Sequence, residues 1–256
     1  MTENNHPLSK VPEVTLAFWI IKIAATTLGE TGGDTVTMTL NLGYLVGTAI
    51  FATLLVALIA IQIRAKKFHP AIYWLTIIAS TTAGTTLADF ADRSLGIGYA
   101  GGSTLLLLLL MLSLFVWYRS EGSISVDTVA TPRVEIFYWV TITLSQTLGT
   151  ALGDWLADDT PLGYSGGALV FGAALAIVAA LYFWTKTSHV ALFWAAFILT
   201  RPLGATVGDF LDKPLSHGGL ALSRPIASLV LAVFIIGCLL LIPQRAGKHH
   251  APPGRH

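Results

Sequence analysis

Charged residues are scarce in this sequence. They make up 11% of the 256 residues, against about 25% in a soluble domain. Hydrophobic residues make up 54%, and the mean hydropathy is +0.70. A chain with so little charge cannot cover a water-exposed surface, so the composition predicts an integral membrane protein. The balance of charges gives no indication of nucleic-acid binding.

Cysteine is nearly absent as well. Cys238 is the single one, which excludes a disulfide within the chain and argues against thiolate metal ligation. The sequence has no Ser/His/Asp set, no H-E-x-x-H motif and no nucleotide-binding loop, so we expect neither an enzyme nor a cofactor. Its polar first ten residues do not resemble a cleavable signal peptide.

A repeat organises the rest of the chain. Each of four copies contains a Gly followed five residues later by an Asp. The pairs are Gly29 and Asp34, Gly84 and Asp89, Gly149 and Asp154, and Gly204 and Asp209. A residue of the first half corresponds to the residue 120 positions later in the second half. An aromatic residue and a Trp precede each Gly, and we interpret this row as packing or as an aromatic band at the membrane surface.

Eight apolar stretches are long enough to span a bilayer, and because they lack the alternation of barrel strands they predict helices. They cover residues 11–32, 44–63, 70–89, 99–118, 134–156, 164–184, 189–211 and 220–242. The predicted fold is therefore an all-α integral membrane protein of eight transmembrane helices, arranged as four helical-hairpin repeats in two pseudo-symmetric halves. We expect a disordered N-terminus (1–10), a first half (11–120), a cytoplasmic linker (121–132), a second half (133–242) and a polar tail (243–256).

Basic residues predict the orientation. Ten lie on the side that holds both termini and only two, Arg93 and Lys213, lie on the other. The ten are Lys10, Arg64, Lys66, Lys67, Arg119, Arg133, Lys186, Arg245, Lys248 and Arg255. Because basic loops stay in the cytoplasm, we expect both termini there and the Gly–Asp motifs in the outer half of the membrane.

Polar residues recur at every fourth position of the odd-numbered predicted helices, which places them on one face. The even-numbered helices are nearly all apolar, so we expect the odd helices inside and the even ones toward lipid. The stripe is expected to bind an ion through Glu30, Asp34, Asp89, Asp154 and Asp209. Its supporting members are Lys22, Thr26, Thr81, Thr85, Gln146, Thr150 and Arg201, and the outer acidic mouth comprises Asp92, Asp158 and Asp212.

The chemistry of these residues favours a small cation. An Asp within the bilayer costs about 2.5–3.5 kcal/mol, so carboxylates placed there are expected to have a function. Carboxylates that converge in a medium of low dielectric constant either hold protons or bind cations. Oxygen ligands suit hard divalent ions, so we expect a transporter of Mn²⁺ or Mg²⁺ as substrate. The unequal stripes predict a site near the first copy, with Lys22 and Arg201 as internal counter-charges.

Other interpretations stay open at this point. The carboxylates could cap helices or form local pairs, such as Asp89 with Arg93, in an intramembrane scaffold or sensor with a structural polar core. Lys22 and Arg201 could instead serve a transporter of a small acidic metabolite. The sequence does not determine the ion, the direction of transport or the oligomeric state, and the lipid bilayer is the one partner that it indicates.

The segments K-V-P-E-V (residues 10–14), T-T-L-G-E-T-G-G-D (26–34) and T-L-G-T-A-L-G-D-W (147–155) carry a resemblance. Together with the other copies, across residues 11–242, they resemble a bacterial family of uncharacterised membrane-anchored proteins built from a four-copy membrane repeat of unknown function. The resemblance implies a bacterial inner-membrane protein, and it implies no activity.

Overall fold

The structure, a computed structural model, describes residues 8–247. Within these residues eight α-helices follow one another, and the one β-type pairing is an isolated bridge between Pro12 and Ala246. The helices are α1 (Leu16–Asp34), α2 (Tyr44–Arg64), α3 (Pro70–Asp89), α4 (Tyr99–Glu121), α5 (Pro132–Asp158), α6 (Gly163–Trp184), α7 (His189–Asp212) and α8 (Arg224–Leu241). The predicted all-α class is confirmed.

Five of these helices, α2, α4, α6, α7 and α8, are long and apolar enough to cross a membrane. This indicates a membrane protein with transmembrane helices. In the apolar stretch of α6 only 6% of the residues are buried, whereas 61% are buried in that of α7. The apolar side chains of α6 therefore face outward, as lipid-facing side chains must, while α7 lies inside the bundle.

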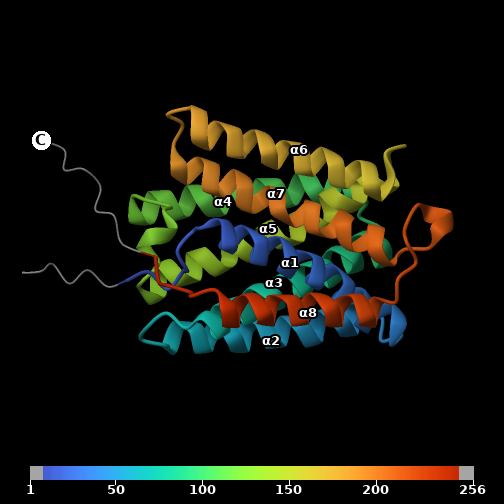
Figure 1. Ribbon diagram of the computed structural model, residues 1–256, viewed down its shortest axis with the longest axis horizontal. Helices are drawn as coiled ribbons and strands as arrows, with labels where there is room; N and C mark the ends of the chain where they lie inside the picture. The colour runs from blue at the N-terminus through green and yellow to red at the C-terminus, as the bar shows by residue number, and fades with distance from the viewer. Residues whose placement is uncertain (1–7, 248–256) are drawn as a thin grey trace, which may run out of the picture.

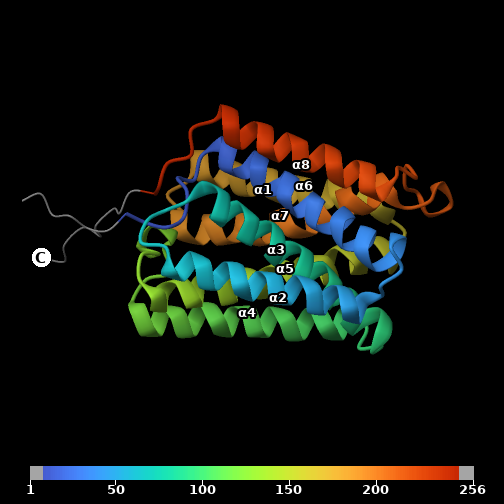
Figure 2. The same ribbon diagram turned by 90° about the horizontal axis from the view of Figure 1, so that it is seen from below.

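The helices form an inner and an outer set (Figure 1). The inner helices pack in a closed cycle: α1 contacts α3 and α7, and α5 contacts the same two helices. Each outer helix packs on the inner helix of the following repeat, α2 on α3, α4 on α5 and α6 on α7, while α8 closes the cycle on α1. Figure 2 shows the inner helices between the outer ones from a second direction. This is the arrangement that the polar stripes predict.

Two helix starts differ from the predicted spans by four or five residues. The first helix begins at Leu16 rather than at residue 11, because the Thr15 side chain accepts a hydrogen bond from the Phe18 N–H and caps it. The last helix begins at Arg224 rather than at residue 220, with Pro225 in its first turn, where a missing N–H costs nothing.

Residues 9–12, before α1, are buried where the two ends of the described chain meet. The Lys10 ammonium lies 2.5 Å from a carboxylate oxygen of Glu135, which is 0% exposed, and donates to the carbonyls of Gln62 and Ile63. The Gly247 N–H donates to the Val11 carbonyl, so the two ends of the described chain pair. Residues 1–7 of the predicted disordered N-terminus, and the histidines of the polar tail, lie outside the described residues.

Candidate acidic site between the inner helices

Glycines bring the inner helices close together. In each copy the first Gly of the repeat faces a side chain of the next inner helix so closely that a Cβ atom there would overlap it. The contacts are Gly29 with Thr81, Gly84 with Gln146, Gly149 with Arg201, and Gly204 with Thr26. The four contacting residues occupy the same position in each repeat, so equivalent contacts join every pair of neighbouring inner helices around the cycle. Small residues at this spacing allow close helix packing in a membrane, which the G-x-x-x-G pattern predicts.

The four repeated Asp residues, Asp34, Asp89, Asp154 and Asp209, make up what we term the acidic layer. All four are at most 3% exposed. Carboxylate oxygens of Glu30, Asp34 and Asp89 lie within 4.8 Å of one another, and so do those of Glu30, Asp154 and Asp209. The structure therefore brings together all five residues that the sequence assigns to an ion, with Glu30 common to both groups.

Two basic residues bridge the acidic layer in pairs. Arg93 contacts Asp89 at 2.8 Å and Asp154 at 3.3 Å, while Lys213 contacts Asp34 at 2.8 Å and Asp209 at 3.0 Å. Burial lowers the pKa of both basic groups, but the neighbouring carboxylates outweigh this effect and raise the pKa of each above its usual value. Both groups therefore remain charged at neutral pH, and each holds two repeats together.

The Arg201 guanidinium lies in the middle of the bundle, next to Glu30. Its Nη2 atom is 2.9 Å from a Glu30 carboxylate oxygen and donates to the hydroxyls of Thr85 and Thr150. These three partners occupy one repeat position in copies one to three, and the fourth copy has Ala205 there. One long side chain of α7 therefore pairs with polar groups of the other three inner helices.

The remaining stripe residues lie further from the acidic layer than Glu30: Lys22 by two helical turns, and Thr26, Thr81 and Gln146 by one turn, about 5.4 Å along the axis. The Thr26 hydroxyl lies within hydrogen-bond distance of the carbonyls of Lys22, Ile23 and Thr200 and donates to them. The contact with Thr200 joins α1 to α7, so this hydroxyl has a structural role. Lys22 is 0% exposed, and its ammonium lies 4.1 Å from the centre of the Phe197 ring.

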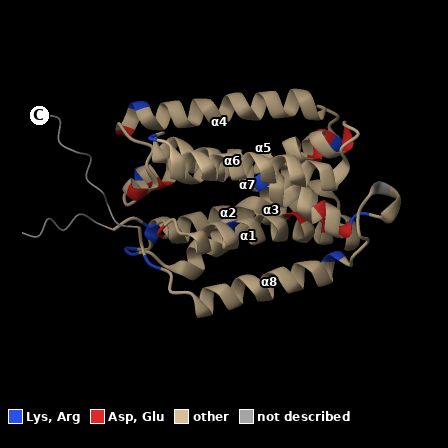
Figure 3. Cartoon of the chain, turned by 45° about the horizontal axis from the view of Figure 1, so that its top comes forward, with Lys and Arg blue, Asp and Glu red and all other residues tan. Residues whose placement is uncertain are grey.

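The predicted outer mouth is only partly assembled. Asp158 accepts hydrogen bonds from Arg93, Tyr99 and Tyr164 at the acidic end of the bundle. Asp212 is buried and pairs with Arg224 at 3.4 Å. Asp92, in contrast, is half-buried beside Gly102 of α4, and it belongs to none of the close carboxylate groups found among the described residues. Figure 3 shows the Asp and Glu positions gathered mainly at the two ends of the bundle, while Lys and Arg positions also occur in its middle.

The bridging role of Arg93 and Lys213 is what the sequence reasoning missed. The sequence indicated two separate pairs within a helix, whereas each basic group also reaches a carboxylate of the neighbouring inner helix. A signal was present, because Arg93 and Lys213 occupy equivalent positions, 120 residues apart. Tyr99 and Tyr164 are likewise equivalent members of their repeats, and both contact Asp158.

An aromatic layer closes the other half of the bundle. The aromatic residue before each Trp packs on the Trp of the next repeat, with ring centroids 5.5 to 6.5 Å apart. The pairs are Phe18 with Trp74, Tyr73 with Trp139, Tyr138 with Trp194, and Phe193 with Trp19. The hydroxyls of Tyr73 and Tyr138 meet at 2.6 Å. The predicted packing role of this row is confirmed.

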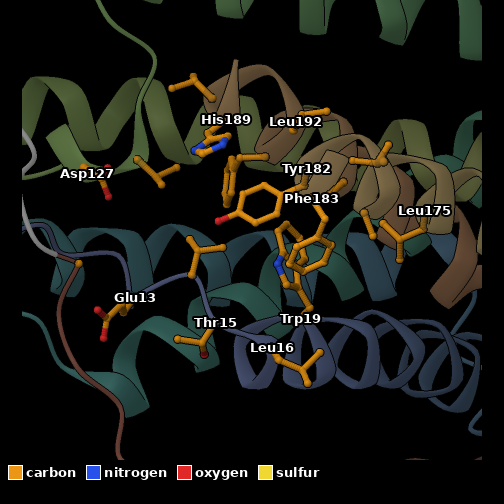
Figure 4. Close-up of a pocket in the computed structure, with 18 of the residues that line it drawn as sticks. Glu13, Thr15, Leu16, Trp19, Asp127, Leu175, Tyr182, Phe183, His189 and Leu192 are labelled. Carbon is orange, nitrogen blue, oxygen red and sulfur yellow. The ribbon is translucent and has the colours of Figure 1, made fainter. Parts of the chain in front are cut away.

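A separate cavity of about 1010 Å³ lies between α1, α6 and α7 (Figure 4). Trp19, Tyr182 and Phe183 line its apolar part, while Glu13 and Asp127 lie at one end. None of the polar-stripe residues lines it. The cavity is therefore distinct from the acidic site.

A family model described as a repeat of unknown function (DUF347) matches the chain four times. The matches cover residues 17–68, 72–123, 137–188 and 192–243, so each contains one inner helix and the outer helix that follows it. Neither the curated proteins nor the solved structures contain a match to this chain.

Proposed function

The chain belongs to the family built from the repeat of unknown function (DUF347), and from that premise we propose that it is a membrane transporter of a small divalent cation, with Mn²⁺ or Mg²⁺ as substrate. The ion would bind to Glu30 and the acidic layer. We propose transport rather than catalysis, because the buried polar groups converge on one site along the axis of the bundle.

The observation that carries this proposal is a charge imbalance. Seven carboxylates, those of Glu30, the acidic layer, Asp158 and Asp212, share four basic partners, namely Arg93, Arg201, Lys213 and Arg224. Three negative charges are thus left over when all groups are ionised. Asp34 Oδ1 is buried and has no hydrogen-bond partner. A divalent cation would offset two of these charges, and oxygen ligands are those that Mn²⁺ and Mg²⁺ prefer.

The cycle of helix contacts supports a proposed architecture of eight transmembrane helices. We propose two pseudo-symmetric halves, because equivalent glycines, aromatic pairs and bridging bases recur at a fixed offset of 120 residues. In this arrangement the acidic layer would lie nearer one side of the membrane, and the aromatic layer would close the path to the other. Transport would require the aromatic pairs to separate.

A structural polar core is the second candidate, and the ion pairs of Arg93 and Lys213 favour it. Charged groups that bridge neighbouring helices could hold the bundle together without moving an ion. The two candidates differ in one respect. A structural core needs no bound ion at the acidic layer, whereas a transporter must bind a cation there.

We expect Asp34→Asn, Asp89→Asn and Glu30→Gln to reduce divalent-cation flux about tenfold or more. Each change keeps the shape of the side chain but removes a charge, and a lost charged interaction of about 1.5–3 kcal/mol corresponds to at least a tenfold effect. Flux of Mn²⁺ and Mg²⁺ into proteoliposomes measures this. Glu121→Gln, which removes a carboxylate paired at the surface, is the matched control.

Folding of each variant is checked by its elution volume and its thermal unfolding. If the folded variants move both ions as fast as the parent, or if the parent moves neither, transport of these ions is excluded. The structural core is then the better description.

We also propose that the protein lies in a bacterial inner membrane with both termini in the cytoplasm. The basic residues support this orientation, since ten lie on the side of the termini and two on the other. After Cys238→Ala, a cysteine at Lys66 or Lys186 should resist an impermeant thiol reagent in intact cells, while one at Thr160 should react. The reverse pattern would place the acidic layer on the cytoplasmic side.

A further inference from the structure

Buried polar atoms without partners gather one helical turn below Glu30, on the side away from the acidic layer. Both side-chain amide atoms of Gln146 lack a hydrogen-bond partner, as do Thr81 Oγ1 and the Nε and Nη1 atoms of Arg201. All three residues are 0% exposed. An unpaired polar group in an apolar interior costs about 1–3 kcal/mol, so a cluster of them indicates a missing partner.

These atoms belong to one place in the bundle. Thr81 lies one helical turn from Thr85, and Gln146 one turn from Thr150, each on the same helix face. Thr85 and Thr150 both accept hydrogen bonds from Arg201. Thr81 and Gln146 therefore surround the side of Arg201 that faces away from the acidic layer.

Lys22 adds a buried basic group without an ion-pair partner to the same region. Its Nζ atom lies 3.5 Å from the hydroxyl of Thr200, the residue next to Arg201. Lys22 takes part in none of the ion pairs found among residues 8–247. Burying a lone ammonium is far more costly than burying a paired one.

We propose that Lys22, Thr81, Gln146 and Arg201 form a binding site for a small monocarboxylate. Glu30 balances the charge of Arg201, so the ammonium of Lys22 leaves room for one negative charge. The free N–H groups of Arg201 and Gln146 and the hydroxyl of Thr81 are donors directed by the surrounding helices. A carboxylate offers two oxygens with several lone pairs to such donors, which a second cation cannot do.

This site goes beyond the proposed cation transport and does not depend on it. The acidic layer and the monocarboxylate site lie at different depths, on opposite sides of the Glu30–Arg201 pair. An anion in one and a cation in the other would each be favoured by the charge of its own surroundings. Binding of the monocarboxylate can therefore be tested without any divalent ion.

The experiment uses the full chain in nanodiscs of zwitterionic lipid at fixed pH. Thermal unfolding is followed by tryptophan fluorescence as sodium acetate replaces sodium chloride at constant ionic strength. We expect acetate to raise the unfolding midpoint, because a ligand that binds only the folded state stabilises it. Lys22→Met and Gln146→Leu should weaken the apparent acetate affinity about tenfold or more, since each removes a buried donor.

Thr82→Val is the matched control, because the Thr82 hydroxyl donates a hydrogen bond to the Ile78 carbonyl of its own helix. This variant should respond to acetate like the parent. A second measurement separates binding from a structural role. Without acetate, Lys22→Met and Gln146→Leu should be at least as stable as the parent, because each removes an unpaired buried group.

The proposal is overturned if acetate and chloride give the same midpoint, or if both variants keep the parent response to acetate. It is also overturned if both variants are less stable than Thr82→Val in the absence of acetate, since Lys22 and Gln146 would then be structural. Failure of the cation proposal looks different. In that case Asp34→Asn and the parent show equal divalent flux, whatever the acetate response.

Discussion

Replacing Arg201 by Met is expected to destabilise the protein by about 3–5 kcal/mol. The change leaves the Glu30 carboxylate buried between four helices without its 2.9 Å partner. Removing one member of a buried ion pair has this cost because the remaining charge loses its compensation while it stays out of water. The hydroxyls of Thr85 and Thr150 lose their donor in the same step.

A double-mutant cycle measures the pair itself. Arg201→Met combined with Glu30→Gln should cost clearly less than the sum of the two single changes, because no lone charge remains. The free energy of unfolding is measured in lipid or micelles under conditions where unfolding is reversible. Arg133→Met is the control: its side chain is 71% exposed, and its pair with Glu121 should contribute at most about 1 kcal/mol. Additive effects at Glu30 and Arg201 would contradict the structure.

The second large effect is expected when both bridging bases are removed. Arg93→Met together with Lys213→Met leaves four buried carboxylates without the groups that join them in pairs. Each broken pair costs about 3–5 kcal/mol, so the variant should unfold when divalent ions are removed with a chelator. Added Mn²⁺ should restore folding, because an ion that binds only the folded state stabilises it.

The parent protein provides the comparison. Its unfolding midpoint should rise with Mn²⁺ by less than that of the double variant, because two of its four acidic-layer charges are already balanced. Lys66→Met with Lys67→Met removes two exposed charges and should leave the midpoint and its response to Mn²⁺ unchanged. If the variant without Arg93 and Lys213 folds normally in chelator, these bases do not hold the acidic layer together.

The acidic site could be predicted in part. The sequence identified Glu30 and the four repeated Asp residues. A carboxylate in an apolar helix is rare, and the regular spacing of the Asp residues can be recognised in the sequence. The predicted start of the first helix was wrong, because residues before Thr15 pair with a distant part of the chain, as Pro12 does with Ala246.

What the sequence by itself determined is the repeat, the all-helical class and the division into inner and outer helices. All three follow from periodicity along single helices, and a membrane requires each helix to satisfy its own backbone. Only the tertiary structure decided which charges meet. Arg93 reaches Asp154, Lys213 reaches Asp34 and Arg201 reaches Glu30, each across a boundary between helices. The spacing along a helix determines on which face of that helix a residue lies. Which residue of another helix it then contacts depends on how the four copies pack around the ring.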